Sequence, residues 1–355
     1  MRWTLVVPPL AVVVLALTWD RDLGWALSVL AGAVLGGAVL AAVHHAEVVA
    51  HRVGEPFGSL VLAVAVTVIE VGLIVTLMVS GEPSETSTLA RDTVFAAVMI
   101  TLNGIVGVSV LVGSVRRHVA DFNAEGTGSA LAAVTTLATV CLVLPRFTES
   151  EAGPEFSTAQ LVFAAVASIG IYGLFVVVQT VRHRDYFLPV EESTAQDEHA
   201  PPPSDRDALV SVGLLLVALV AVVGLAKTIS PAIEDGVDAA GFPPSAVGVV
   251  IALLVLAPES LAAVRAARRD RVQTSFNLAL GSAMASIGLT IPSIAVASIW
   301  LEGPLDLGLG ASQMVLLALT VVVSVLTVVP GRATLLEGGV HVAIFGAFLF
   351  LAVNP

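Results

Sequence analysis

Long apolar runs separated by short polar segments follow one another along the whole chain. A membrane-spanning helix needs about 20 predominantly apolar residues. Eleven runs are of roughly this kind, and they lie at about 4–19, 24–43, 59–80, 93–114, 128–146, 158–181, 208–229, 244–264, 273–298, 311–329 and 334–353. The pattern predicts an all-α polytopic membrane protein with about 11 transmembrane helices.

Composition supports this class and excludes a soluble domain. Of the 355 residues, 57% are hydrophobic and 12% are charged, whereas soluble domains carry about 25% charged residues. The first run is short enough to resemble a signal peptide. However, Trp19 to Asp22 (WDRD) is not a small-residue cleavage site. We therefore predict that residues 1–22 form an extra N-terminal transmembrane helix.

The positive charges predict the orientation in the membrane, because Lys and Arg accumulate in cytoplasmic loops. Loops on one side hold Arg2, Arg52, Arg116, Arg117, Arg182, Arg184, Arg206, Arg265, Arg268, Arg269, Arg271 and Arg332. Loops on the other side hold Arg21, Arg91, Arg146 and Lys227. Twelve against four places the N-terminus in the cytoplasm and the C-terminus outside.

A polar, proline-containing segment at 182–207 divides the chain and is predicted to be a flexible cytoplasmic linker. Five spans lie before it in residues 23–181, and five lie after it in residues 208–355. An odd number of spans makes the second half enter the membrane from the opposite side. The organisation therefore predicts a 5+5 inverted-topology repeat, which is common in secondary transporters with a midplane site.

Each half carries one glutamate deep within its second span, Glu70 and Glu259. A carboxylate at the centre of a helix costs about 2.5–3.5 kcal/mol on insertion scales. A proton or a bound cation would offset that cost, and a pair holding either one in turn would work as an antiporter. The alternative is two permanently protonated carboxyls that donate structural hydrogen bonds.

Other oxygen donors lie near the glutamates in the sequence. Ca²⁺ binds about six to eight oxygens, and Pro258 has no N–H to donate to the carbonyl one turn before it. The candidate cation- and proton-binding residues are Glu70, Glu259, Asn103, Asn277, Ser282 and Ser286, with Glu70 and Glu259 as the metal ligands. For the asparagines and serines, ordinary interhelical hydrogen bonds are the alternative.

Two histidine positions are also candidates for chemistry. His44, Glu47 and His51 are spaced to share one helical face, which fits a solvated helix end, a metal site or a proton relay. His341 follows Glu337 by one turn in the last span, and either packs as a hydrogen-bonded side chain or titrates near neutral pH.

These residues leave two alternatives to an antiporter. One is an intramembrane metalloenzyme that uses the His44, Glu47 and His51 cluster, and the other is a passive cation channel. The first leaves Glu70 and Glu259 unexplained, and a channel is usually ringed by several chains. We expect no enzymatic activity, no cofactor and no nucleic-acid partner.

The glutamate segments resemble a known family. "GEPFGSLVLAVAVTVIEV", "LNGIVGVSVLVG" and "APESLAAVRAARRDRVQTSFNLALGSAMASIGLTIP" are similar to the two α-repeats of the calcium/cation antiporter superfamily, and "HHAEVVAHRVGEPFG" resembles its ChaA-type bacterial cation/proton antiporters. The resemblance implies a calcium/cation exchanger-like fold and exchange of Ca²⁺, or of Na⁺ or K⁺, for H⁺ across an inner membrane. It also implies that Glu70 and Glu259 are the central ligands.

Overall fold

The computed structural model describes residues 2–19, 21, 23–54, 57–81, 86–188, 203–300 and 303–355. In the described part, ten helical segments are long and apolar enough to cross a membrane, and a shorter apolar helix, α1 (Arg2–Thr18), precedes them. The predicted class and the approximate number of spans are therefore confirmed. Most of the predicted linker, residues 189–202, lies outside the described residues.

The first half contains five spans. α2 (Trp25–Val53) and α3 (Phe57–Ser80) come first. The third span joins α5 (Leu89–Met99), the π-helix η1 (Ile100–Ile105) and α6 (Val106–Arg117). The fourth joins α7 (Ala124–Ala138), η2 (Thr139–Val143) and η3 (Leu144–Arg146). The fifth joins α8 (Thr158–Val177) and η4 (Val178–Arg182), and the short η5 (Arg184–Phe187) follows it.

The second half contains the other five spans. They are α9 (Asp205–Ala239), α10 (Ser245–Arg268), α11 (Val272–Ala297), α12 (Ala311–Val328) and α13 (Leu335–Val353). Two helices are longer than predicted, because α2 continues to Val53 and α9 continues past Pro231 to Ala239. In both, the helix continues into polar residues, which a prediction based on apolar runs leaves out of the span.

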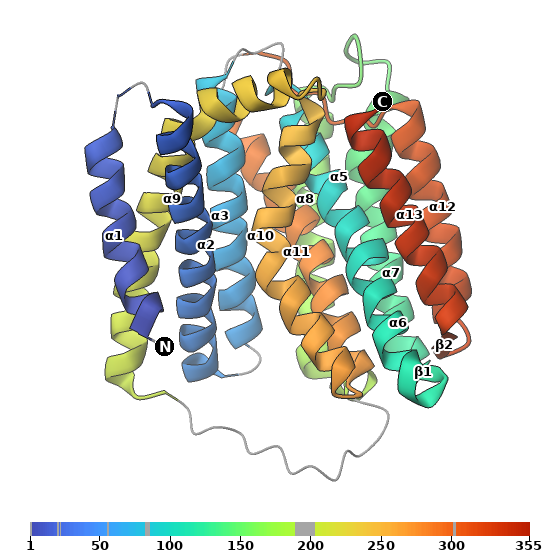
Figure 1. The fold of residues 1–355 in the computed structure, drawn as a ribbon. Coiled ribbons are helices and arrows are strands. Elements are labelled where there is room, and N and C mark those ends of the chain that lie inside the picture. Colours follow the sequence, from blue (N-terminus) through green and yellow to red (C-terminus); the bar gives the residue numbers. More distant parts are fainter. Residues whose placement is uncertain are drawn as a thin grey trace.

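The helices form two packed groups (Figure 1). Buried side chains of α1, α2, α3, α9 and one side of α10 make one core cluster, which includes Leu35, Ile69 and Leu225. Those of α5 to α8 and α11 to α13 make the other, which includes Phe95 and Phe276. α10 contributes buried side chains to both groups, so it is placed to form a site between them.

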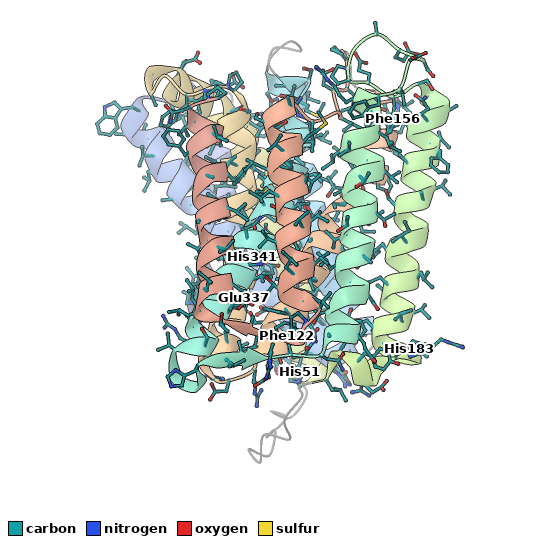
Figure 2. All side chains as sticks on the ribbon, turned by 90° about the vertical axis from the view of Figure 1, so that its right-hand side faces the viewer. His51, Phe122, Phe156, His183, Glu337 and His341 are labelled. Carbon is teal, nitrogen blue, oxygen red and sulfur yellow. The ribbon has the colours of Figure 1, made fainter. Side chains whose placement is uncertain are left out.

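A short ribbon joins the halves on the face where η5 ends and α9 begins, which we call the linker face (Figure 1). β1 (Val119–Asp121) follows α6 and pairs antiparallel with β2 (Arg332–Thr334), which precedes α13. Figure 2 shows Phe122 beside this ribbon, where its N–H donates to the carbonyl of Gly331 at 3.0 Å. These three-residue strands were not predicted, because they are too short to show an alternating pattern.

Candidate ion-binding site

Glu70 and Glu259 line one cavity of about 260 Å³ between α3, α8, α10 and α11. The polar side chains around it are Thr67, Glu70, Gln179, Glu259, Thr274, Asn277, Ser282 and Ser286. The structure therefore brings together five of the six site residues predicted from the sequence. Gln179 and Thr274 were missed. Gln179 had a usable signal, since it is a carboxamide near the end of the largely apolar fifth span.

Glu70 is held by the opposite half of the protein. Its side chain is 4% exposed, and Ser286 on α11 donates a hydrogen bond to its Oε1 at 2.7 Å. A serine from the second half thus contacts the glutamate of the first. This contact fixes one carboxylate oxygen at the wall of the cavity.

Glu259 is buried with one oxygen unsatisfied. Its residue exposure is 9%, and within the described residues its Oε2 has no hydrogen-bond partner. The preceding Pro258 lies inside α10 and has no N–H for the helical ladder. Buried polar atoms in folded proteins are normally satisfied. The Glu259 carboxyl is therefore placed to take up a proton or a cation from the cavity.

Ser282 and Asn277 also line the cavity, and Asn277 is already engaged in hydrogen bonds. The Asn277 Nδ2 donates to the carbonyl of Phe187 at 2.6 Å, and its Oδ1 accepts from Gln273 Nε2 at 2.8 Å. Asn277 therefore ties α11 to η5, the short helix at the start of the predicted linker. Its amide already supports the wall of the cavity near the linker face.

Asn103 does not line this cavity, contrary to its predicted place beside the glutamates. It is fully buried in η1, where its Nδ2 donates to Thr320 Oγ1 at 2.9 Å and its Oδ1 pairs with His341 Nδ1 at 3.1 Å. His341 Nε2 lies 3.1 Å from Thr327 Oγ1, and Figure 2 shows His341 within α13. The interhelical alternative fits Asn103 in this conformation, and His341 is a packed, hydrogen-bonded side chain.

The histidine cluster on α2 does not form a metal site. His44 Nδ1 lies 3.9 Å from Glu47 Oε2, and both side chains are substantially exposed. His51 is exposed at the end of the same helix. No group of three or more His, Cys, Asp or Glu that could hold a metal occurs in the described residues. The solvated helix end is the interpretation that fits this geometry.

The cavity extends from the glutamates toward the linker face. Leu62 lies near the start of α3, Thr274 near the start of α11 and Gln179 near the end of the α8 span, and all three line it. On the other side of the glutamates, Gly288 packs so closely on α8 that an added Cβ would lie 2.7 Å from Tyr172 Cβ. The lining residues thus lie at the level of the glutamates or nearer to the linker face, and α8 and α11 pack tightly toward the opposite face, which we call the outer face.

A family model described as "Sodium/calcium exchanger protein" matches residues 23–181 and 210–354. The chain belongs to this family. Among its relatives, the "Putative ionic transporter y4hA" of Sinorhizobium fredii is 44% identical over 99% of this chain and 96% of its own length. The "Sodium-potassium/proton antiporter ChaA" of Escherichia coli is 34% identical over 98% of this chain and 94% of its own length.

Solved structures of other proteins share the fold. Native YfkE superposes with a TM-score of 0.70 at 17% identity and covers 99% of each chain. The H⁺/Ca²⁺ exchanger CAX gives a TM-score of 0.71 at 16% identity over 98% of this chain and 90% of its own. The protein is thus a multi-pass membrane antiporter of the exchanger family. The metalloenzyme and channel alternatives are wrong.

Proposed function

We propose that the protein exchanges a metal cation for protons by alternating access, with Glu70 and Glu259 binding cation and protons in competition. The observation that carries this proposal is the unsatisfied, buried Glu259 Oε2 in the same cavity as Glu70. Burial disfavours a bare carboxylate, and a second carboxylate nearby disfavours it further. The pair is therefore stable with protons or with a cation, and unstable with neither.

Ca²⁺ is the proposed cation, with Na⁺ or K⁺ as alternatives. Two carboxylates balance a divalent charge, and Ser282 and Ser286 add hydroxyl oxygens of the kind that hard cations bind. The relatives support both kinds of ion. One is named as a sodium-potassium/proton antiporter, and another, from Aphanothece halophytica, is named as a Ca²⁺/H⁺ antiporter at 25% identity.

We place the protein in a bacterial inner membrane with its N-terminus in the cytoplasm. The arginine-rich loops lie on the linker face, which the positive-inside rule assigns to the cytoplasm. In this orientation the conformation described above is open inward. It would collect a cytoplasmic cation and then release it outside in exchange for protons.

Purified protein in proteoliposomes tests the proposal directly. An imposed pH gradient should drive uptake of Ca²⁺, Na⁺ or K⁺, each supplied separately, with proton movement of opposite sign in the same vesicles. Cation flux that neither depends on the pH gradient nor moves protons would overturn the proposal.

A further inference from the structure

A second cavity, of about 200 Å³, lies at the outer face between the ends of α5, α10, α12 and α13. Its wall includes Arg91 and Asp92 of α5, Val249 of α10, Gln313 of α12 and Phe348 of α13. The proposed ion site does not include it. The inward cavity has its own set of residues, and none is shared between the two.

Most of the helices around the outer cavity correspond to helices around the inward cavity. The inward cavity uses the second and fifth spans of the first half (α3 and α8) with the second and third spans of the other (α10 and α11). The outer cavity uses the second and fifth spans of the second half (α10 and α13) with the start of the third span of the first (α5), and its fourth element is α12 instead of α3. Three of its four helices therefore correspond, with the two halves exchanged, to helices around the inward cavity.

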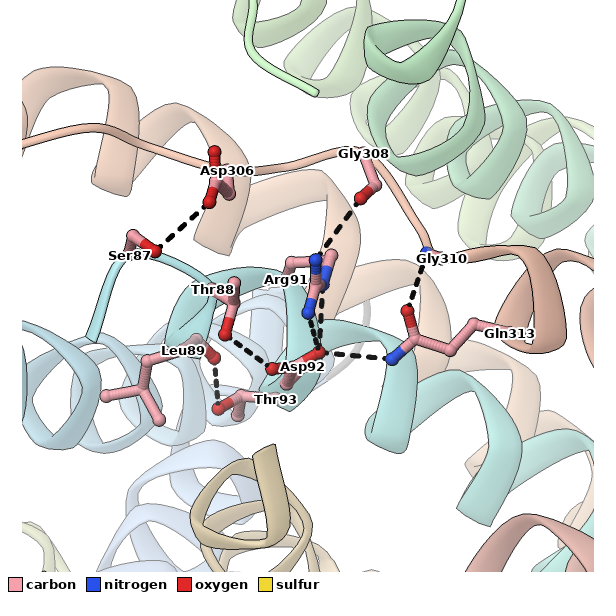
Figure 3. Close-up of polar contacts among 10 residues, drawn as sticks. All are labelled: Ser87, Thr88, Leu89, Arg91, Asp92, Thr93, Asp306, Gly308, Gly310 and Gln313. Atoms are coloured by element: carbon pink, nitrogen blue, oxygen red, sulfur yellow. Dashed lines mark hydrogen bonds and ion pairs between the residues drawn. The ribbon is translucent and has the colours of Figure 1, made fainter. Parts of the chain in front are cut away.

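Asp92 closes this outer cavity with a complete set of contacts (Figure 3). Its Oδ1 accepts from Arg91 Nε at 2.9 Å and from Gln313 Nε2 at 3.1 Å, and its Oδ2 accepts from Thr88 Oγ1 at 2.8 Å. The side chain is 2% exposed. Arg91 also reaches the carbonyl of Gly308 at 3.3 Å. Because both carboxylate oxygens are engaged, Asp92 joins α5 to α12 and does not offer a free ion ligand.

Backbone packing completes the closure beside Asp92. Gly248 of α10 lies so close to α5 that an added Cβ would be 2.9 Å from the backbone N of Thr93 and 3.0 Å from the Asp92 carbonyl carbon. A side chain at this position would have to push the two helices apart. The polar contacts of Asp92 thus join α5 to α12, and the absence of a side chain at Gly248 lets α5 pack closely on α10.

We propose that the outer cavity is the closed outer passage of the exchanger and that Arg91, Asp92 and Gln313 form its gate, called the outer gate below. The inference rests on the proposed alternating access. Breaking the outer gate should shift the protein from the inward-open to the outward-open conformation. Asp92 is then a residue that sets the balance between conformations, at a position remote from the ion site.

The test measures access to single cysteines in purified protein in lipid nanodiscs, where both faces are exposed to reagent. The buried Cys141 is first replaced by Ser, and Val249→Cys or Leu278→Cys is added as reporter of the outer or inward cavity. Asp92→Asn keeps the size of the side chain but replaces one acceptor oxygen by an NH₂ group that cannot accept a hydrogen bond. Gln313→Ala removes the hydrogen bond from α12 to Asp92. We expect labelling of Val249→Cys by a charged thiol reagent to accelerate about tenfold, since a hydrogen bond to a charged group is worth about that factor or more. Labelling of Leu278→Cys should slow.

Gly248→Ala provides a second route to the same result without changing charge. It should also accelerate labelling of Val249→Cys, because it forces apart the helices that the gate joins. Glu151→Gln, which removes an exposed carboxylate from the α7–α8 loop, is the control and should change neither rate. Unchanged labelling of Val249→Cys in both Asp92→Asn and Gly248→Ala would overturn the proposal. Labelling does not require transport. The outcome of this test can therefore be distinguished from a failure of the proposed exchange activity in proteoliposomes.

Discussion

Ser286 Oγ lies 2.7 Å from Glu70 Oε1, so the third span of one half donates a hydrogen bond to the glutamate of the other. Any movement of α11 relative to α3 would change this contact. Both side chains line the cavity that also holds Glu259. The proposed ion site is therefore built from side chains of both halves.

Neutralising either glutamate should abolish exchange while leaving the fold intact. Glu70→Gln and Glu259→Gln keep side-chain size but cannot release a proton or supply charge to a cation. Removing a buried charge also removes its insertion cost, about 2.5–3.5 kcal/mol on insertion scales. We expect no proton-coupled cation flux in proteoliposomes and thermal unfolding at or above the wild-type temperature.

The exposed Glu151→Gln variant is the control for this experiment and should transport normally. Two permanently protonated structural carboxyls would give the opposite result, because glutamine resembles a protonated carboxyl. Substantial exchange by both glutamine variants would therefore exclude the proposed mechanism.

Cation affinity should fall as the pH is lowered, because protons and the cation occupy the same carboxylates. In the acidic range, the apparent affinity should drop by up to about tenfold per pH unit for each proton displaced. Equilibrium binding of ⁴⁵Ca²⁺ or ²²Na⁺ to detergent-solubilised protein, between about pH 5 and 9, measures this dependence. An affinity that is constant over that range would contradict competition.

Ser286→Ala should weaken cation binding without unfolding the protein. Loss of a hydrogen bond to a charged group costs about 1.5–3 kcal/mol, which predicts a decrease in affinity of roughly tenfold or more. Ser293→Ala is the matched control on the same helix, because Ser293 Oγ bonds to the carbonyl of Leu289. Equal affinities in the two variants would show that the Ser286 contact does not reach the bound ion.

Asn103→Ala should act on stability more than on binding. It would leave His341 and Thr320 without their partner in a fully buried place, at a cost of about 1–3 kcal/mol for each unsatisfied group. We expect a lower unfolding temperature, with apparent cation affinity changed less than about twofold in protein that remains folded. A large loss of affinity at unchanged stability would return Asn103 to the set of direct ligands.

Much of the fold could be predicted because the membrane imposes helix length and apolarity on every span. Glu70 and Glu259 could be predicted for the same reason, since an acid inside a span stands out. Asn103 could not be placed, because its side chain turns toward α12 and α13 and sequence spacing does not show which neighbour a helix face meets. Asp92 lies just outside the predicted span at about 93–114, yet the residue is 3% exposed. A charge near the end of a span gives no sequence signal for burial between helices.

The β1–β2 ribbon links a helix of the first repeat to a helix of the second. A body that moves as one piece therefore need not coincide with one sequence repeat. Val119 pairs with Thr334 and Asp121 with Arg332, so the end of α6 is fixed to the start of α13 across the linker face. A rotation of α13 that opens the outer passage must pivot about this pairing and carry the foot of α6 with it. Under the proposed alternating access, each moving body would then contain helices of both repeats, with the hinge at the linker face and the largest displacement at the outer end of α13.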